Sequence, residues 1–219
     1  MADPRLHLLH LSSPTLPIGA YAYSQGLEYA VEAGWVDGNR LRAWLSDGLH
    51  LSVATLDLPV LARAHAACEV RADDAIDAWN DLLLASRETA ELLLEDQQIG
   101  AALWRLLGSL GAPWLPELAQ APGYAVAFAV ACAGWGIDRD TACAAYCFAW
   151  LENQVTAATK LVPLGQSAAQ ALLVELLEEI DGACAAAGTV ADEAIGLSCP
   201  GLALASCRHE HQHTRLFRS

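Results

Sequence analysis

Apolar side chains recur along most of this 219-residue chain at spacings of three and four positions, and this helical period is the strongest constraint on its fold. The clearest stripe follows Asp37 and consists of Leu41, Trp44, Leu45, Gly48, Leu49, Ser52 and Val53. No stretch alternates apolar and polar residues with period two over a convincing length. The pattern predicts an all-α protein, a helical bundle of roughly eight to ten helices of ordinary globular length.

Breaking residues predict where some of these helices begin and end. Asp57 followed by Pro59 looks like a fresh helix start, because proline fits a first turn but disrupts a helix interior. We therefore expect a helix break near residues 54–57. Shorter helical pieces are expected near residues 190–197 and 201–208.

The length of the chain suits one large domain with a sizeable core. Residues 111–122 contain three prolines, yet strong helical patterns resume directly after them, so we expect a connection there and a single domain over residues 1–219. Hydrophobic residues make up 54% of the chain and charged residues 17%, which is more apolar than an ordinary globular domain. Part of that apolar surface is expected to contact a partner.

Charge and targeting features argue against several classes of protein. The net charge of −14 disfavours a nucleic-acid surface, which needs clustered lysine and arginine. The longest weakly polar runs, residues 124–137 and 141–151, fall short of the ~20 apolar residues that cross a bilayer. The first residues show no export signal, and the odd number of widely spaced cysteines favours reduced thiols. We therefore expect a cytoplasmic protein that binds neither nucleic acid nor membrane.

Residues 11–36 form an ordered approach to a short amphipathic helix. Pro14 and Pro17 restrict φ, and Gly19 frees the backbone just before the helix. Ser24 is a candidate N-cap, and Gly34 stands where a C′ glycine belongs. The apolar face of this helix carries Tyr23, Leu27, Ala30 and Val31, and the other face carries Glu28 and Glu32.

At these residues the chain closely resembles the UreF family of urease accessory proteins, whose N-terminal signature looks like SPxLPIGxxxYSxGLE. The matching residues are Ser13, Pro14, Leu16, Pro17, Ile18, Gly19, Tyr23, Ser24, Gly26, Leu27 and Glu28. The segment from Lys160 to Gln166 resembles the family's K-x-VP-x-xQ segment. The end of the chain is similar to the family's HExxxxRLxxS ending, through His209, Glu210, Arg215, Leu216 and Ser219.

The resemblance implies a scaffold that takes part in urease maturation and is not itself an enzyme. It implies a complex with the accessory protein UreD, also called UreH, recruitment of the GTPase UreG, and docking of this assembly onto the urease apoprotein. Nickel would be cargo in transit, and no resident cofactor is expected. A homodimer is the expected oligomer.

The resemblance also assigns roles to particular residues. Tyr21 and Arg215 are expected to come together when UreD orders the tail, and to form a site that UreG uses. Lys160 is expected to modulate the GTPase. The full set of expected partner-binding residues is Tyr21, Tyr23, Ser24, Glu28, Lys160, Arg215 and Leu216. Residues 1–22 and 207–219 are expected to be flexible until a partner binds, since the tail is polar and buries little area.

A different class of function is suggested by the tail itself, which carries Cys207, His209, His211 and His213 within seven residues. In an extended conformation these side chains would share one face, and imidazoles at this spacing suit a borderline divalent metal such as nickel. The alternatives are therefore a flexible polar tail that orders against a partner, or a helical metal-binding protein or metalloenzyme.

Lys160 is the only lysine among twelve basic residues. Its compact ammonium can approach a phosphate or carboxylate singly, or it can satisfy the carbonyls at a helix C-terminus before Pro163. The sequence contains no Gly-rich phosphate loop, GxSxG elbow, HExxH or CxxC pair. Together with the resemblance, this favours a protein that is not an enzyme.

Overall fold

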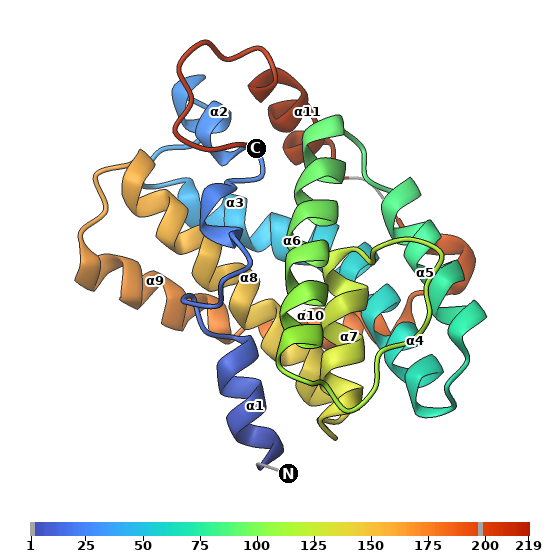
Figure 1. Cartoon of the computed structure of the whole chain (residues 1–219). Coiled ribbons are helices and arrows are strands. Elements are labelled where there is room, and N and C mark those ends of the chain that lie inside the picture. The colour runs from blue at the N-terminus through green and yellow to red at the C-terminus, as the bar shows by residue number, and fades with distance from the viewer. Residues whose placement is uncertain (1–2, 197–198) are drawn as a thin grey trace.

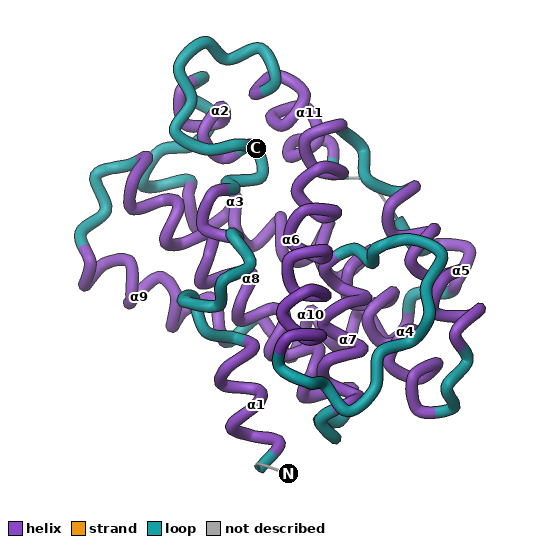
Figure 2. Tube along the Cα trace, in the orientation of Figure 1, coloured by secondary structure: helices purple, strands orange, loops and turns teal. Residues whose placement is uncertain are grey.

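The computed structural model describes residues 3–196 and 199–219, and every regular element in these ranges is a helix (Figures 1 and 2). The α-helices are α1 (Pro4–Leu11), α2 (Leu27–Glu32), α3 (Leu41–Gly48), α4 (Leu58–Glu69), α5 (Asp73–Ala85), α6 (Ala90–Ser109), α7 (Tyr124–Gly134), α8 (Arg139–Leu161), α9 (Gln166–Leu177), α10 (Ile180–Thr189) and α11 (Pro200–His209). Shorter elements are the 3-10 helices η1 (Ala20–Ala22) and η3 (Asp192–Ala194) and the π-helix η2 (Leu49–Asp57). The all-α prediction is confirmed.

The two short pieces predicted near the end of the chain correspond to η3 and α11. Residue 197, the last position of the first predicted piece, lies outside the described residues.

The helix break predicted near residues 54–57 is wrong. Helices α3, η2 and α4 form one continuous run, and the backbone angles at both junctions are right-handed helical. A π-helix shifts each hydrogen bond from the fourth to the fifth residue back, so the run can pass Pro59, which has no N–H to donate. The carbonyl of Thr55, four residues before that proline, accepts a hydrogen bond from Gly196 N at 3.0 Å.

Helix α7 lies at the centre of the molecule. Every residue of Ala125–Cys132 is buried, and α4 and α6 pack against its alanine-rich surface. The lack of a side chain at Gly100 lets α6 come close to the segment that leads into α7: a Cβ there would lie 2.1 Å from the Pro122 carbonyl oxygen. One cluster of buried apolar residues extends from Leu11 to Ala205. Of the helices that the structure describes, none is long and apolar enough to cross a membrane.

The N-terminal segment begins with a helix that the pattern analysis missed. Asp3 is the N-cap of α1, its Oδ1 accepting from Arg5 N at 2.9 Å, and Pro4 occupies the first helical position, where its missing N–H costs nothing. The imidazole of His7 stacks on Trp135, with ring centroids 4.5 Å apart. This contact ties α1 to the segment that follows α7.

Candidate partner-binding surface

The C-terminal tail, residues 210–219, folds back across α2 and α6, so the N-terminal and C-terminal motifs meet in space (Figure 1). The amide and the hydroxyl of Ser24 both donate to the carbonyl oxygen of Ser219, at 2.8 and 2.6 Å. The amide of Arg218 donates to the Ala22 carbonyl at 2.8 Å. Ser219 is fully buried, so the end of this tail is an integral part of the packing.

Glu28 holds the tail to α2. Its Oε1 accepts from the backbone N of Leu216 at 2.7 Å, and its Oε2 accepts from the backbone N of Phe217 at 2.9 Å. The sequence pattern placed Glu28 on the polar face of its helix, but the residue is buried, because the tail covers that face. A buried carboxylate needs hydrogen-bond donors in place of water, and here backbone N–H groups supply them.

The approach of α11 to α2 depends on Gly26. Its φ is 78°, and a Cβ there would lie 2.7 Å from the backbone N of Ser206 on α11. Glycine meets both conditions, since it tolerates positive φ and has no Cβ. Gly26 is the positional N-cap of α2, but the predicted cap Ser24 supplies the side-chain bond, its Oγ accepting from Glu28 N at 3.3 Å.

His209 lies fully buried between two carboxylates. Its Nδ1 is 2.7 Å from Oε2 of Glu91, and its Nε2 is 3.2 Å from Oε2 of Glu28. Arg215 Nη1 donates to Glu91 Oε1 at 2.6 Å. The His209 ring and the Arg215 guanidinium thus contact the same carboxylate, which gives the buried Glu91 polar partners.

The expected contact between Tyr21 and Arg215 is not among the interactions of the described residues. Arg215 is bound to Glu91, whereas Tyr21 is 66% exposed and lines a groove with Arg218. The structure therefore places a different arginine of the tail beside Tyr21. The resemblance singled out Arg215, the arginine of the family's ending, for the tail as UreD orders it, so its contact with Tyr21 in that complex stays a prediction.

Lys160 brings the second motif to the tail. Its Nζ lies 5.2 Å from the ring centroid of Phe217, a cation–π distance. Phe217 is buried and Lys160 is exposed. The lysine side chain therefore packs on a buried ring, and its ammonium group stays accessible to solvent. All three motifs that the sequence singled out therefore meet at one surface.

The other predicted binding residues divide by exposure. Leu216 is 62% exposed, but Tyr23 and Ser24 are buried. The Tyr23 hydroxyl donates to Gln98 Oε1 at 2.5 Å. Tyr23 and Ser24 thus position the surface, whereas Tyr21, Lys160 and Leu216 are available to a partner.

The candidate metal ligands of the tail are not brought together. Helix α11 ends at His209, which points inward, while Cys207, His211 and His213 are exposed. Within residues 3–196 and 199–219, no three His, Cys, Asp or Glu side chains are grouped as metal ligands. The shared face expected for an extended tail is lost because the chain turns after α11.

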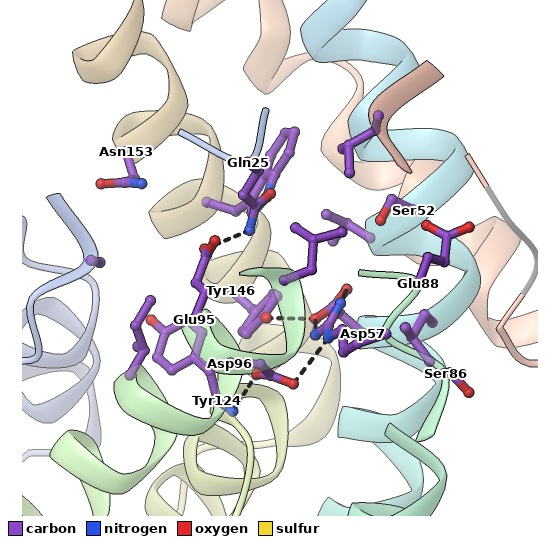
Figure 3. A pocket seen from close by; sticks show the side chains of 18 of the residues that line it. Gln25, Ser52, Asp57, Ser86, Glu88, Glu95, Asp96, Tyr124, Tyr146 and Asn153 are labelled. Carbon is purple, nitrogen blue, oxygen red and sulfur yellow. Dashed lines mark hydrogen bonds and ion pairs between the residues drawn. The ribbon is translucent and has the colours of Figure 1, made fainter. Parts of the chain in front are cut away.

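A buried polar network lies directly behind this surface (Figure 3). The Oγ of Ser219 donates to Glu95 Oε2 at 2.6 Å, Gln25 Nε2 donates to Glu95 Oε1 at 2.8 Å, and Trp150 Nε1 donates to Gln25 Oε1 at 2.8 Å. Burial raises the pKa of Glu95 to about 7. These residues couple the tail to a cavity of about 70 Å³ in the interior.

The far side of that cavity is an ion-paired cluster. Arg87 donates to Asp57 Oδ1 at 2.6 Å and to Asp96 Oδ2 at 3.0 Å, and the Tyr146 hydroxyl donates to Asp57 Oδ1 at 2.8 Å. Burial alone would lower the pKa of Arg87, but the charges of Asp57 and Asp96 raise it well above its ordinary value. Sequence reasoning missed Glu91 and Glu95 of α6 and Arg87 of the preceding loop, because isolated charges carry no motif.

The sequence of the chain is similar to that of one family of known proteins. A family model described as UreF matches residues 35–177. The chain is 50% identical to the urease accessory protein UreF of Teredinibacter turnerae over 221 residues, covering 100% of both chains. It is 49% identical to that of Alkalilimnicola ehrlichii, covering 97% of this chain and 94% of the relative. The protein of the same name from Chromohalobacter salexigens is 48% identical, with coverages of 97% and 93%.

Proposed function

The chain belongs to the UreF family of urease accessory proteins, and from this premise we propose that it is the scaffold on which the urease maturation complex assembles. In this role it binds UreD, recruits the GTPase UreG and modulates its GTP hydrolysis, and docks the assembly onto the urease apoprotein. It acts as a homodimer in the cytoplasm and is not an enzyme. Nickel is the cargo of the assembly and passes to urease.

The observation that carries this proposal is the meeting of the three motifs at the tail. Glu28 from the first motif, Lys160 from the second and Phe217 beside the third are joined by hydrogen bonds and a cation–π contact. A surface built from such distant segments depends on the tail for its shape. That dependence suits a protein that assembles partners one after another.

The charged groups at this surface support binding rather than chemistry. Glu28 and Glu91 hold the tail, Arg215 forms an ion pair with Glu91, and His209 lies between the two carboxylates. The exposed residues are a phenol, an ammonium and a leucine side chain, from Tyr21, Lys160 and Leu216. Such a mixture of apolar and charged groups is typical of protein interfaces.

Light scattering coupled to size-exclusion chromatography tests the proposal. The chain alone should elute with twice its 23.2 kDa mass. Addition of UreD should give a defined larger complex, and addition of UreD with UreG a still larger one. A chain that ignores both partners yet binds one equivalent of nickel or zinc would instead support the metal-binding alternative for His211 and His213.

A further inference from the structure

A groove of about 460 Å³ runs beside the tail, between α6 and the segment that precedes α2. Ala101 and Ala102 of α6 form part of its wall, and their small side chains leave room for another chain to come close. Tyr21 and Leu94 line it as well and are 66% and 50% exposed. We call this feature the α6 groove. Large apolar side chains exposed in a concavity indicate a site for another molecule.

Helix α6 supplies half of the residues that line this groove. The residues Leu94, Gln97, Gln98, Ala101 and Arg105 recur there at spacings of one, three and four. This face carries a single charge, that of Arg105, and no carboxylate, although the chain as a whole has a net charge of −14. The α6 groove therefore carries no negative charge, although the protein as a whole is acidic.

Two arginines in the groove lack acidic partners. Among the described residues, Arg105 and Arg218 form no ion pair, whereas Arg42, Arg87 and Arg215 each contact a carboxylate. The side chain of Arg218 makes only a 3.4 Å hydrogen bond to Gln98 Oε1. Both are exposed, so they offer guanidinium groups that a partner's carboxylates can engage through paired hydrogen bonds.

We propose that the α6 groove binds an amphipathic segment of an assembly partner that carries carboxylates beside an apolar side chain. Arg105 and Arg218 contact the carboxylates, and Leu94 and Tyr21 contact the apolar side chain. The proposal rests on the proposed scaffold function and adds to it the chemistry of the partner. It also makes Arg218 the cation that the tail offers outward, while Arg215 holds the tail in place.

Charge complementarity favours an acidic partner segment over a second copy of the chain as the molecule that binds in the α6 groove. A second copy of the chain is strongly acidic overall. Where the two grooves approach each other, however, it would place its own arginines opposite Arg105 and Arg218. It would therefore neutralise these two cations less well than an acidic partner segment does. Amphipathic helices commonly bind in grooves through apolar side chains spaced by three and four residues. A partner segment of this kind would cover the apolar residues and neutralise both arginines.

The test measures binding of purified UreD, and then of UreG to the chain–UreD complex, at two salt concentrations. The variants are Arg105→Glu, Arg218→Glu and the double variant, and the matched control is Arg139→Glu, which reverses an exposed arginine at the start of α8. The double variant should raise the Kd of one partner by about tenfold or more and weaken its salt dependence, because attraction becomes repulsion. The control should bind like the wild type.

Three results would overturn the proposal. The first is a double variant that keeps its melting temperature and binds both partners with wild-type affinity. The second is a change in the mass of the chain alone, which would assign the groove to a second copy. The third is a wild-type chain that binds neither partner. Only the third also removes the proposed scaffold function, so the two failures are distinguishable.

Discussion

Ser24 and Ser219 are 195 positions apart in the sequence and are joined by two buried hydrogen bonds, in which the amide and hydroxyl of Ser24 share one carbonyl oxygen. Both residues are fully buried. If the tail left this site, those donors would have to find other partners or go unsatisfied, which costs more than a hydrogen bond between exposed groups. The tail is therefore held by specific polar contacts as well as by apolar packing.

Replacement of Phe217 should change the reactivity of Lys160. The change Phe217→Ala removes the ring that lies 5.2 Å below Nζ and should loosen the tail, at a cost of about 2–4 kcal/mol in the free energy of unfolding. Lys160 is the sole lysine, so acylation by an amine-reactive ester, followed at that residue by mass spectrometry, should become faster. The variant Phe217→Leu keeps an apolar side chain and should lose less stability while showing the same direction of change. Unchanged labelling in both variants would remove the cation–π contact from the account.

Glu28→Gln should destabilise the protein and free the tail. The amide keeps the shape of the side chain but cannot offer two charged acceptors to Leu216 N and Phe217 N. We expect a loss of about 1–3 kcal/mol in urea unfolding and faster proteolysis after residue 209. Exposed Glu178→Gln should change stability by no more than about 0.5 kcal/mol. Equal stability of the two variants would show that Glu28 does not hold the tail.

Gly26→Ala should be strongly unfavourable, although it adds only one methyl group. Alanine is strained at φ 78°, and its Cβ would meet Ser206 N at 2.7 Å, so α11 would have to shift away from α2. We expect a loss of about 1–3 kcal/mol, measured by thermal or urea unfolding. Gly188→Ala on α10 meets no atom within 4 Å and should be neutral or stabilising by up to about 1 kcal/mol. The account fails here if both substitutions have the same effect.

Glu95 should make stability depend on pH. Burial raises its pKa from 4.5 to about 7, so between these values the folded chain binds more protons than the unfolded chain. The free energy of unfolding therefore falls as pH rises through this window, and this contribution is constant above it. Glu95→Gln removes the ionisation and should gain about 1–3 kcal/mol relative to the wild type between about pH 5 and about pH 8.

Urea unfolding of both proteins across this pH range measures the difference. The exposed control Glu178→Gln should follow the wild-type curve. If wild type and Glu95→Gln show parallel curves, Glu95 is ionised in the folded protein throughout the range.

The fold class was accessible from sequence because helical periodicity is a local signal. One of the two weakly polar runs that are too short to cross a bilayer contains α7, and this helix is buried. Pro59 misled the prediction because its effect depends on hydrogen-bond register, and a π-helix accommodates it inside a longer run. Helix α1 was missed although Asp3 and Pro4 form an ordinary helix start.

The candidate surface was accessible only in part, because motifs identify residues but not their contacts. Glu28 follows the polar face of its helix in the sequence, yet it is buried by a tail from the other end of the chain. Arg215 is the arginine of the tail motif, but the motif does not show that Arg215 binds Glu91 while Arg218 lines the α6 groove. Contacts between distant segments of this kind have no signature in a single sequence.

The most direct test of the central claim compares the wild-type chain with a chain that ends at His209, each mixed with UreD and UreG and measured by light scattering. Circular dichroism first establishes that the shortened chain keeps its helical signal and a cooperative melting transition. The account predicts a defined complex with both partners for the wild type and none with UreG for the shortened chain, because the surface shared by Tyr21, Lys160 and Leu216 needs the tail. A folded shortened chain that assembles with both partners as the wild type does would contradict it.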